Sequence, residues 1–243
     1  MTLRRRADRL LVERGLFESR ARAKAAIAAG LVMADEIPLR RASDEVTVDA
    51  LLRAAPEHPW VSRGGVKLAA ALDHFGFDPR DCVCLDVGAS TGGFSDVLIS
   101  RGAACVYAVD VGRGQLHPRL SQRPEIVSFP QTDIRQLDRT ALAQLPNFVV
   151  VDVSFISLKL VLPAALGLAR SPARLLALIK PQFEAGRRHL KKGIVRDAEV
   201  RRAACDDLAS VVGSLGWTVI GIALSALPGR DGNREFFLGA GRD

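Results

Sequence analysis

The most informative segment of the sequence is Leu85-Asp86-Val87-Gly88-Ala89-Ser90-Thr91-Gly92-Gly93-Phe94. It begins in an apolar segment, passes through an acid into a glycine-rich turn, and continues over residues 94–99 with helical spacing. This order of strand, glycine loop and helix brings a ligand against bare backbone at the carboxyl end of a parallel strand. Residues 88–93 are called the glycine loop below.

Three classes of cofactor bind at loops of this kind, and the residues favour one of them. A P-loop would end in Gly-Lys-Ser or Gly-Lys-Thr, which this loop lacks. A dinucleotide fold fits loosely, but Ser90 replaces its middle glycine and Asp86 would repel a pyrophosphate. S-adenosyl-L-methionine instead brings a cationic sulfonium and an amino group, which a carboxylate stabilises. The predicted S-adenosyl-L-methionine site comprises Asp86, Gly88, Ala89, Ser90, Gly92 and Gly93.

Two further acids follow predicted strands and extend this site. Asp110 ends the second strand, where an acid can accept hydrogen bonds from both ribose hydroxyls of a nucleoside cofactor. Asp133 follows the third strand and is expected to bind the adenine amino group. Asp96, in the helix after the glycine loop, is expected to be an exposed acid outside the site.

Length and composition suit one α/β domain with a small additional domain. The chain has 243 residues, of which 48% are hydrophobic, enough for a sizeable core. No segment approaches the ~18 uninterrupted apolar residues of a membrane-spanning helix, and no apolar segment of a secretory signal follows the arginine-rich start. The formal net charge of +7 favours a polyanionic partner. We expect a cytoplasmic protein that does not insert into membranes.

The cysteines and histidines predict neither disulfides nor a metal site. Three of the four cysteines lie in strand-like apolar segments, where a reduced cysteine behaves as a small hydrophobic residue. Cys82 and Cys84 share one strand face without a second Cys or His pair nearby, and the four histidines lack metal-ligand spacing. We therefore expect no metal cofactor.

The first 55 residues concentrate basic charge and are typical of a small α+β domain. A short amphipathic helix around residues 10–12 ends at Gly15, and a second helix, capped by Glu18 or Ser19, extends to Gly30. Short strands are expected at 31–33 and 46–48. So small a domain buries little apolar surface by itself and gains from docking on a larger neighbour.

The rest of the chain predicts a linker and a larger domain. Pro56 and Pro59 mark a stiff linker over residues 56–64, and residues 65–243 form the larger domain. Alternating apolar strands and helices indicate a parallel sheet covered on both faces. The last strand follows a link too short for a crossover helix, so it should run antiparallel. We predict a Rossmann-like α/β sheet of the class I methyltransferase type, with strands at 82–87, 104–109, 126–129, 147–153, 174–179, 217–224 and 235–239 and helices at 65–75, 93–101, 156–169 and 197–213.

Motifs in order along nearly the whole chain resemble one family. The stretch from Arg6-Ala-Asp8 to Gly30 resembles the S-four-type (αL) RNA-binding domain. Five further motifs resemble the TlyA (haemolysin-A-like) family, which comprises ribosomal-RNA 2′-O-methyltransferases with an FtsJ-like catalytic domain. These motifs are Val61-Ser-Arg-Gly-Gly-Val-Lys67-Leu, the glycine loop, Val151-Asp152-Val-Ser-Phe-Ile-Ser157-Leu, Ile179-Lys180-Pro-Gln-Phe-Glu184 and Gly232-Asn-Arg-Glu235-Phe-Phe-Leu. One departure is Val32-Met-Ala-Asp-Glu-Ile37, where the family has a Val-x-Val-Asn-Gly-like strand and turn. The resemblance implies methylation of cytidine ribose in ribosomal RNA.

The resemblance also implies a Lys-Asp-Lys-Glu catalytic set, which falls on Lys67, Asp152, Lys180 and Glu235. The predicted strand ends put Asp152 and Lys180 on the same rim as the glycine loop. A ribose hydroxyl needs a group that accepts or holds its proton. Because two ammonium groups in one pocket repel each other, one lysine can exist as the free amine, and we assign this role to Lys180. Asp152 and Glu235 would orient the lysines, and Lys67 would position the ribose or its phosphate.

Two basic sets are expected to contact ribosomal RNA, free or in a ribosomal subunit. Phosphate contacts of this kind depend on salt and little on sequence. The set that follows Lys180 is placed to hold the strand that presents the target nucleotide, whose base should swing out of its stack. The sets are Arg4, Arg6, Arg20, Arg22 and Lys24 in the N-terminal domain, and Arg187, Arg188, Lys191 and Lys192 in the larger domain.

Three other functions fit the residues less well. A membrane-lytic protein, which the haemolysin label suggests, would need a spanning or strongly amphipathic helix, whereas the N-terminal helices are short and interrupted at Gly15. A non-catalytic RNA-binding or ribosome-assembly protein would not need all four catalytic candidates. A methyltransferase of DNA bases or protein would carry an Asn-Pro-Pro-Tyr-like tetrad where Asp152-Val-Ser-Phe155 stands.

Overall fold

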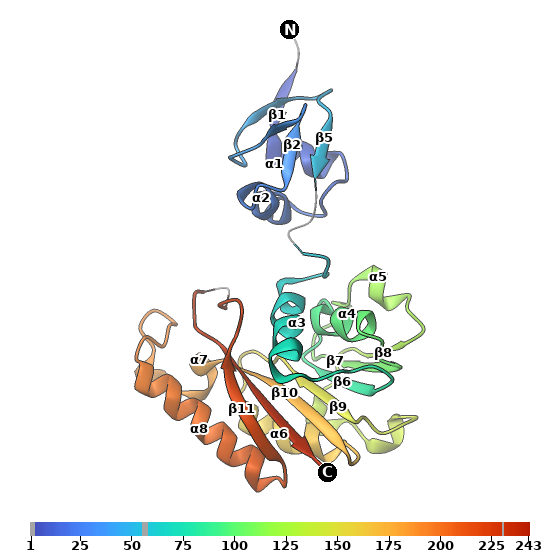
Figure 1. Ribbon diagram of the computed structural model, residues 1–243, viewed down its shortest axis with the longest axis vertical. Helices are drawn as coiled ribbons and strands as arrows, with labels where there is room; N and C mark the ends of the chain where they lie inside the picture. Colours follow the sequence, from blue (N-terminus) through green and yellow to red (C-terminus); the bar gives the residue numbers. More distant parts are fainter. Residues whose placement is uncertain (1–2, 55–57, 230) are drawn as a thin grey trace. The chain divides into compact units, whose positions relative to one another are not determined.

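The computed structural model describes residues 3–54, 58–229 and 231–243. The chain divides into two compact units, Met1–Pro59 and Trp60–Asp243 (Figure 1). The division falls inside the range 56–64 that the sequence predicts as a linker; its Pro56 lies outside the described residues.

The larger unit is built on a seven-stranded sheet of order β11-β12-β10-β9-β6-β7-β8. Neighbouring strands from β10 to β8 are parallel, while β12 is antiparallel to both β10 and β11. The predicted seven strands and antiparallel last strand are confirmed. The strands are β6 Val83–Val87, β7 Cys105–Val109, β8 Ile126–Phe129, β9 Phe148–Val151, β10 Ala173–Ile179, β11 Thr218–Leu224 and β12 Phe236–Arg242.

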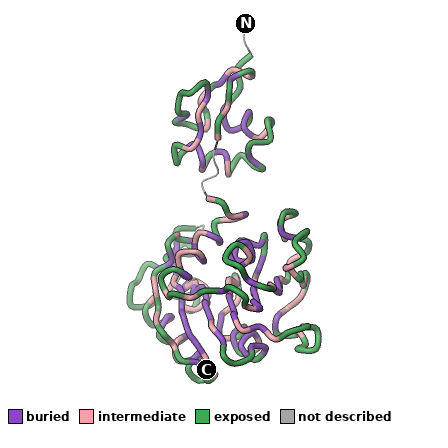
Figure 2. Tube along the Cα trace, turned by 45° about the vertical axis from the view of Figure 1, so that its right-hand side comes forward, coloured by how far each residue is buried: buried purple, intermediate pink, exposed green. Residues whose placement is uncertain are grey.

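Helices cover both faces of this sheet, as its uniformly apolar central strands require. Residues of β6, β9 and β10 are buried throughout or nearly so (Figure 2). Their alternate side chains enter two hydrophobic clusters, one with α3 and α4 and the other with α6 and α8. The helices are α3 Arg63–Phe75, α4 Gly93–Ser100, α5 Pro118–Ser121, α6 Leu158–Gly167, α7 Pro181–Glu184 and α8 Ala198–Ser214, with 3-10 turns at Ile134–Gln136, Arg139–Ala141 and Arg187–His189.

The smaller unit has its own core between two helices and short strands. Ser19 caps α2 by accepting a hydrogen bond from the backbone N–H of Arg22. Asp35 and Glu36 turn the β2–β3 hairpin with φ of 48° and 65°, so a hairpin forms even without the family's Asn-Gly turn. The elements are β1 Arg4–Arg6, α1 Ala7–Glu13, α2 Arg20–Ala28, β2 Val32–Ala34, β3 Ile37–Pro38, β4 Glu45–Thr47 and β5 Leu52–Ala54, paired as β1-β4 and β3-β2-β5.

Two features are absent from the described parts of the chain. No described helix is long and apolar enough to cross a membrane. No cluster of three or more His, Cys, Asp or Glu side chains with metal-binding geometry occurs among the described residues.

Candidate active site

The sheet register aligns the predicted site residues along one edge. Val87 pairs with Val151, and Ala177 pairs with the same Val151, so the ends of β6, β9 and β10 meet. Ile179 of β10 pairs with Phe236, the first residue of the antiparallel β12. The residues just beyond these strand ends follow one another in strand order: Glu235, Lys180, Asp152, Gly88 and Asp110.

The glycine loop bends back from β6 because its glycines adopt conformations that other residues rarely take. Gly88 and Gly92 have φ of 84° and 91°. A Cβ on Gly88 would collide with the backbone carbonyl of Asp152, so this glycine lets the loop pack against the end of β9. A Cβ on Gly92 would collide with the side chains of Leu116 and Leu120. Gly92 therefore allows the segment that leads into α5 to pack against the loop, and its contact with S-adenosyl-L-methionine stays a prediction.

Asp110 organises a cavity beside the loop. Its carboxylate accepts hydrogen bonds from the backbone N–H of Ser90 at 2.8 Å and of Gly112 at 2.7 Å. The cavity has a volume of about 280 Å³. This volume lies just below the ~300–1,000 Å³ range of ligand pockets and suits the nucleoside portion of a ligand. It is lined by Ala89, Ser90, Ala108, Asp110, Gly112, Gly114, Gln115, Leu116, Ser121, Ser128 and Pro130.

Asp86 is fully buried beneath the loop. Its Oδ2 accepts a hydrogen bond from Ser95 Oγ at 2.6 Å, while its Oδ1 has no hydrogen-bond partner among the described residues. Burial, reinforced by the charges of Asp152 and Asp110, raises the pKa of Asp86 to about 7. A buried carboxylate oxygen without a partner fits a cationic ligand group. Together, Asp86 and Asp110 give the site two acceptors, one for a positive charge and one for ribose hydroxyls.

The other predicted adenine contact, Asp133, has a different set of partners. Its carboxylate caps the 3-10 turn at Ile134–Gln136 through the backbone N–H of Arg135, and it also binds the guanidinium of Arg135 at 2.6 Å. These hydrogen bonds hold the pKa of Asp133 below its usual value. Among the described residues, Asp133 does not line the cavity, so its contact with adenine stays a prediction.

The four catalytic candidates form two close ion pairs. Lys180 Nζ lies 2.5 Å from Asp152 Oδ1 and donates a hydrogen bond to Ser154 Oγ at 2.8 Å. Lys67 Nζ lies 2.5 Å from Glu235 Oε2, although the two residues are far apart in the sequence. Lys67 and Glu235 are buried, with exposures of 9% and 3%. Each lysine therefore has its own carboxylate partner, consistent with the expected role of Asp152 and Glu235 in orienting the lysines.

The loop after β9 carries an exposed aromatic side chain for which the sequence predicts no role. Phe155 is 91% exposed and has a φ of 65°, which is strained for a bulky residue. Its ring lies 5.2 Å from that of Phe183 in α7. Glu184 fixes the same loop by accepting hydrogen bonds from Ser157 Oγ at 2.5 Å and from the backbone N–H of Leu158 at 2.8 Å. An exposed aromatic side chain held in this way, in the loop whose Ser154 binds Lys180, suits stacking with a flat ligand.

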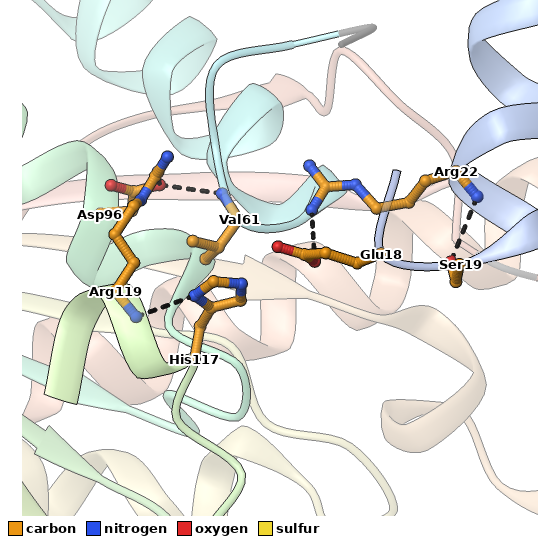
Figure 3. A network of polar contacts seen from close by, with 7 residues as sticks. All are labelled: Glu18, Ser19, Arg22, Val61, Asp96, His117 and Arg119. Atoms are coloured by element: carbon orange, nitrogen blue, oxygen red, sulfur yellow. Dashed lines mark hydrogen bonds and ion pairs between the residues drawn. The ribbon is translucent and has the colours of Figure 1, made fainter. Parts of the chain in front are cut away.

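Asp96 is not the exposed acid that the sequence predicted. It is 8% exposed, because α4 packs on the sheet with one face and on α3 with another. Its carboxylate accepts hydrogen bonds from the backbone N–H of Val61 at 2.8 Å (Figure 3) and from the Arg119 guanidinium at 2.5 Å. Asp96 thus ties the start of the larger unit to α5.

Some residues of the N-terminal basic set form ion pairs or hydrogen bonds within the smaller unit, and others are exposed. Arg6 and Arg20 bind the carboxylate of Asp8, which is 3% exposed, at 3.0 Å and 2.6 Å. The Arg6 hydrogen bond, with help from Arg20 and against the effect of burial, lowers the pKa of Asp8 to about 2. Arg22 pairs with Glu18, also drawn in Figure 3, and Arg4 donates to the Glu45 carbonyl. Lys24 is exposed, as are Arg187, Arg188, Lys191 and Lys192 of the second set.

Taken together, the seven-stranded sheet, the glycine loop and its nucleoside-sized cavity define a Rossmann-like methyltransferase. Residues 60–242 match the FtsJ-like methyltransferase family, and the chain belongs to this family.

Two relatives and a solved structure are similar to nearly the whole chain. The chain is 42% identical to the 16S/23S rRNA (cytidine-2′-O)-methyltransferase TlyA of Mycobacterium tuberculosis, over 98% of this chain and 90% of the relative. It is 33% identical to Hemolysin A of Brachyspira hyodysenteriae, over 95% and 97% of the two chains. A solved Streptococcus thermophilus protein that carries a hemolysin name is 36% identical, with a TM-score of 0.77 over 100% of this chain and 90% of that one.

Proposed function

We propose that this protein is an S-adenosyl-L-methionine-dependent methyltransferase that methylates the 2′-hydroxyl of cytidine in ribosomal RNA. The observation that carries the proposal is the common edge on which the Asp110 cavity, the glycine loop and the Asp152–Lys180 ion pair follow one another. The substrate class rests on the similarity to the M. tuberculosis relative, whose name specifies cytidine 2′-O-methylation of 16S and 23S rRNA.

The donor would be held by residues at the ends of β6 and β7. Asp110 would accept hydrogen bonds from the ribose hydroxyls, and the cavity beside it would take the nucleoside. The buried Oδ1 of Asp86 would face the positive charge at the other end of the ligand. When bound, S-adenosyl-L-methionine supplies an electrophilic methyl carbon, whose bond to sulfur breaks as the bond to the ribose oxygen forms.

The protein's own contribution to the transfer is to hold the ribose hydroxyl and take its proton. Lys180 would accept this proton as the bond to carbon forms, and Asp152 at 2.5 Å would stabilise the resulting ammonium. The buried Lys67–Glu235 pair would position the ribose or its phosphate through Lys67, whose charge Glu235 balances. Asp152 thereby both orients Lys180 and offsets its charge after the transfer.

RNA would be bound through both units. The smaller unit would act as an S-four-type RNA-binding domain, and the exposed cations at 187–192 would contact phosphates near the reacting nucleotide. Phe155 supplies a face on which an unstacked base could rest, since base–aromatic stacking is worth about 1–3 kcal/mol.

The direct test is transfer to isolated ribosomal subunits. Purified protein would be incubated with methyl-labelled S-adenosyl-L-methionine and unmodified small or large subunits, and 2′-O-methylated nucleotides would be mapped. We expect label at cytidine riboses that are unmodified in cells lacking the gene and modified in cells that have it. RNA binding without transfer would instead support a non-catalytic ribosome-assembly protein, and label on bases would exclude the 2′-O assignment.

A further inference from the structure

The amine of Lys180 lies close to two side-chain oxygen atoms of one short loop. Asp152 Oδ1 lies 2.5 Å from Nζ, and Ser154 Oγ accepts a hydrogen bond from it at 2.8 Å. Ser154 is exposed, whereas the Lys180 side chain is only 11% exposed. The bond to Ser154 therefore joins a nearly buried amine to a side chain that takes no part in the hydrophobic core.

The geometry of a free amine gives this second bond a specific consequence. A neutral lysine amine has four tetrahedral directions, occupied by the chain carbon, two hydrogens and one lone pair. When Ser154 accepts one hydrogen and the negative charge of Asp152 attracts the other, the lone pair is turned toward the fourth direction. With Asp152 alone, the amine can turn about its C–N bond and the lone pair has no fixed direction.

We propose that Ser154 is a positioning residue for Lys180, which fixes the amine so that its lone pair is directed at the ribose hydroxyl. This inference rests on the proposed function, because it assigns the lone pair the task of accepting the hydroxyl proton. Ser154 itself neither gains nor loses a proton in the step: the proton moves from the ribose oxygen to Lys180 Nζ.

The loop that carries Ser154 is held firmly enough for this task. Phe155, the next residue, has a φ of 65° and packs on Phe183. Glu184 secures the far end of the loop through Ser157 Oγ and the backbone N–H of Leu158. These contacts hold the backbone of the loop without the Ser154 hydroxyl, so removing the hydroxyl should leave the loop in place.

The test compares Ser154→Ala with Ser154→Thr, which keeps a hydroxyl, and with Ser210→Ala, an exposed serine whose hydroxyl bonds within α8. Ser154→Ala should lower kcat about 10-fold, the value of one hydrogen bond to a charged or reacting amine. KM for donor and for RNA and the melting temperature should not change. The rise of kcat with pH should persist at a lower plateau, since Lys180 is still present. Ser154→Thr should restore most of the rate, and Ser210→Ala should equal wild type.

Each contrary result identifies a different error. Wild-type kcat in Ser154→Ala would overturn the inference while leaving the proposed function intact. A raised KM with unchanged kcat would make Ser154 an RNA contact, and loss of the pH-dependent rise would place Ser154 in the proton path. Failure of Ser154→Thr to restore the rate would show that the hydroxyl is not the relevant group. Absence of transfer by the wild-type protein would overturn the proposed function, and this inference with it.

Discussion

Among the single residues, Lys180 has the most direct role in the proposed reaction, and it lies at the end of a buried strand. It follows the fully apolar end of β10 and meets Asp152 and Ser154. Lys180→Ala should leave folding and donor binding nearly intact while methyl transfer falls by a factor on the order of 10²–10⁴. Lys180→Arg should fail almost as badly, because a guanidinium stays protonated. Lys159→Ala, which removes an exposed lysine paired with Asp207, is the matched control.

The measurement is single-turnover transfer over a range of pH. The wild-type rate should rise with pH, and this rise should be absent from both Lys180 variants. Near-normal turnover by Lys180→Arg would leave Lys180 as an electrostatic positioner only, and the proton acceptor would then have to be Asp152 or a bound water.

Asp86 links stability to pH in the ligand-free protein. Burial raises its pKa from 3.8 to about 7, so the fold favours the neutral carboxyl. This contribution to stability is complete in acid, below the ordinary value, and is lost as the pH rises through about 7. Relative to Asp86→Asn, the wild-type free energy of unfolding should therefore fall by up to about 4 kcal/mol between pH ~4 and ~8. Urea unfolding of both proteins at several pH values measures this; parallel curves would contradict it.

At the scale of elements, the glycine loop depends on the segment that leads into α5. A side chain at Gly92 would strike Leu116 and Leu120, and Leu116 lines the cavity. Gly92→Ala should therefore weaken binding of S-adenosyl-L-methionine at least 10-fold, a loss of about 1.4 kcal/mol, by displacing this wall. Gly76→Ala is the control, because Gly76 also has positive φ but open space around it. Calorimetry with the donor should show normal affinity for Gly76→Ala; equal losses in both variants would attribute the effect to backbone strain.

The elements also show what a sequence can predict. The long strands and helices of the larger unit were predicted to within a few residues, because apolar periodicity and glycine punctuation are local signals. The four-residue helices α5 and α7 were not predicted, since one turn carries too little periodicity. Asp96 was placed on the wrong side of α4, because that helix is covered on more than one face.

In the candidate site, too, some features could be predicted from the sequence and others could not. The strand ends that carry Asp152, Lys180 and Asp110 follow from the order of elements, so their common edge was predictable. The partners of each side chain were not, because Lys67 meets Glu235 across most of the larger unit's sequence. Ser154 and Glu184 gave no sign of their role, since a serine or a glutamate in a loop has no distinctive spacing.

At the scale of the whole molecule, the net charge of +7 does not measure the RNA-binding surface. Arg6 and Arg20 neutralise a buried carboxylate, so replacing them would test the stability of the smaller unit as well as RNA binding. The pKa of Asp8, about 2, means that its stabilising charge is present above pH ~4 and is lost as the pH falls toward ~2. RNA affinity is therefore better tested through cations on the surface.

Two double variants separate the contributions of the basic sets to RNA binding. One variant replaces Arg4 and Lys24 by Ala and tests the smaller unit, and the other replaces Arg187 and Lys191 by Ala and tests the larger unit. Arg80→Ala is the control, because Arg80 lies in the turn before β6, at the opposite edge of the sheet from the site. Each lost phosphate contact should take roughly one unit from the slope of log affinity against log salt. We expect each double variant to flatten the slope by about two units and Arg80→Ala to leave it unchanged. A normal slope in one double variant would mean that its cations serve solubility, and that RNA is bound through the other unit alone.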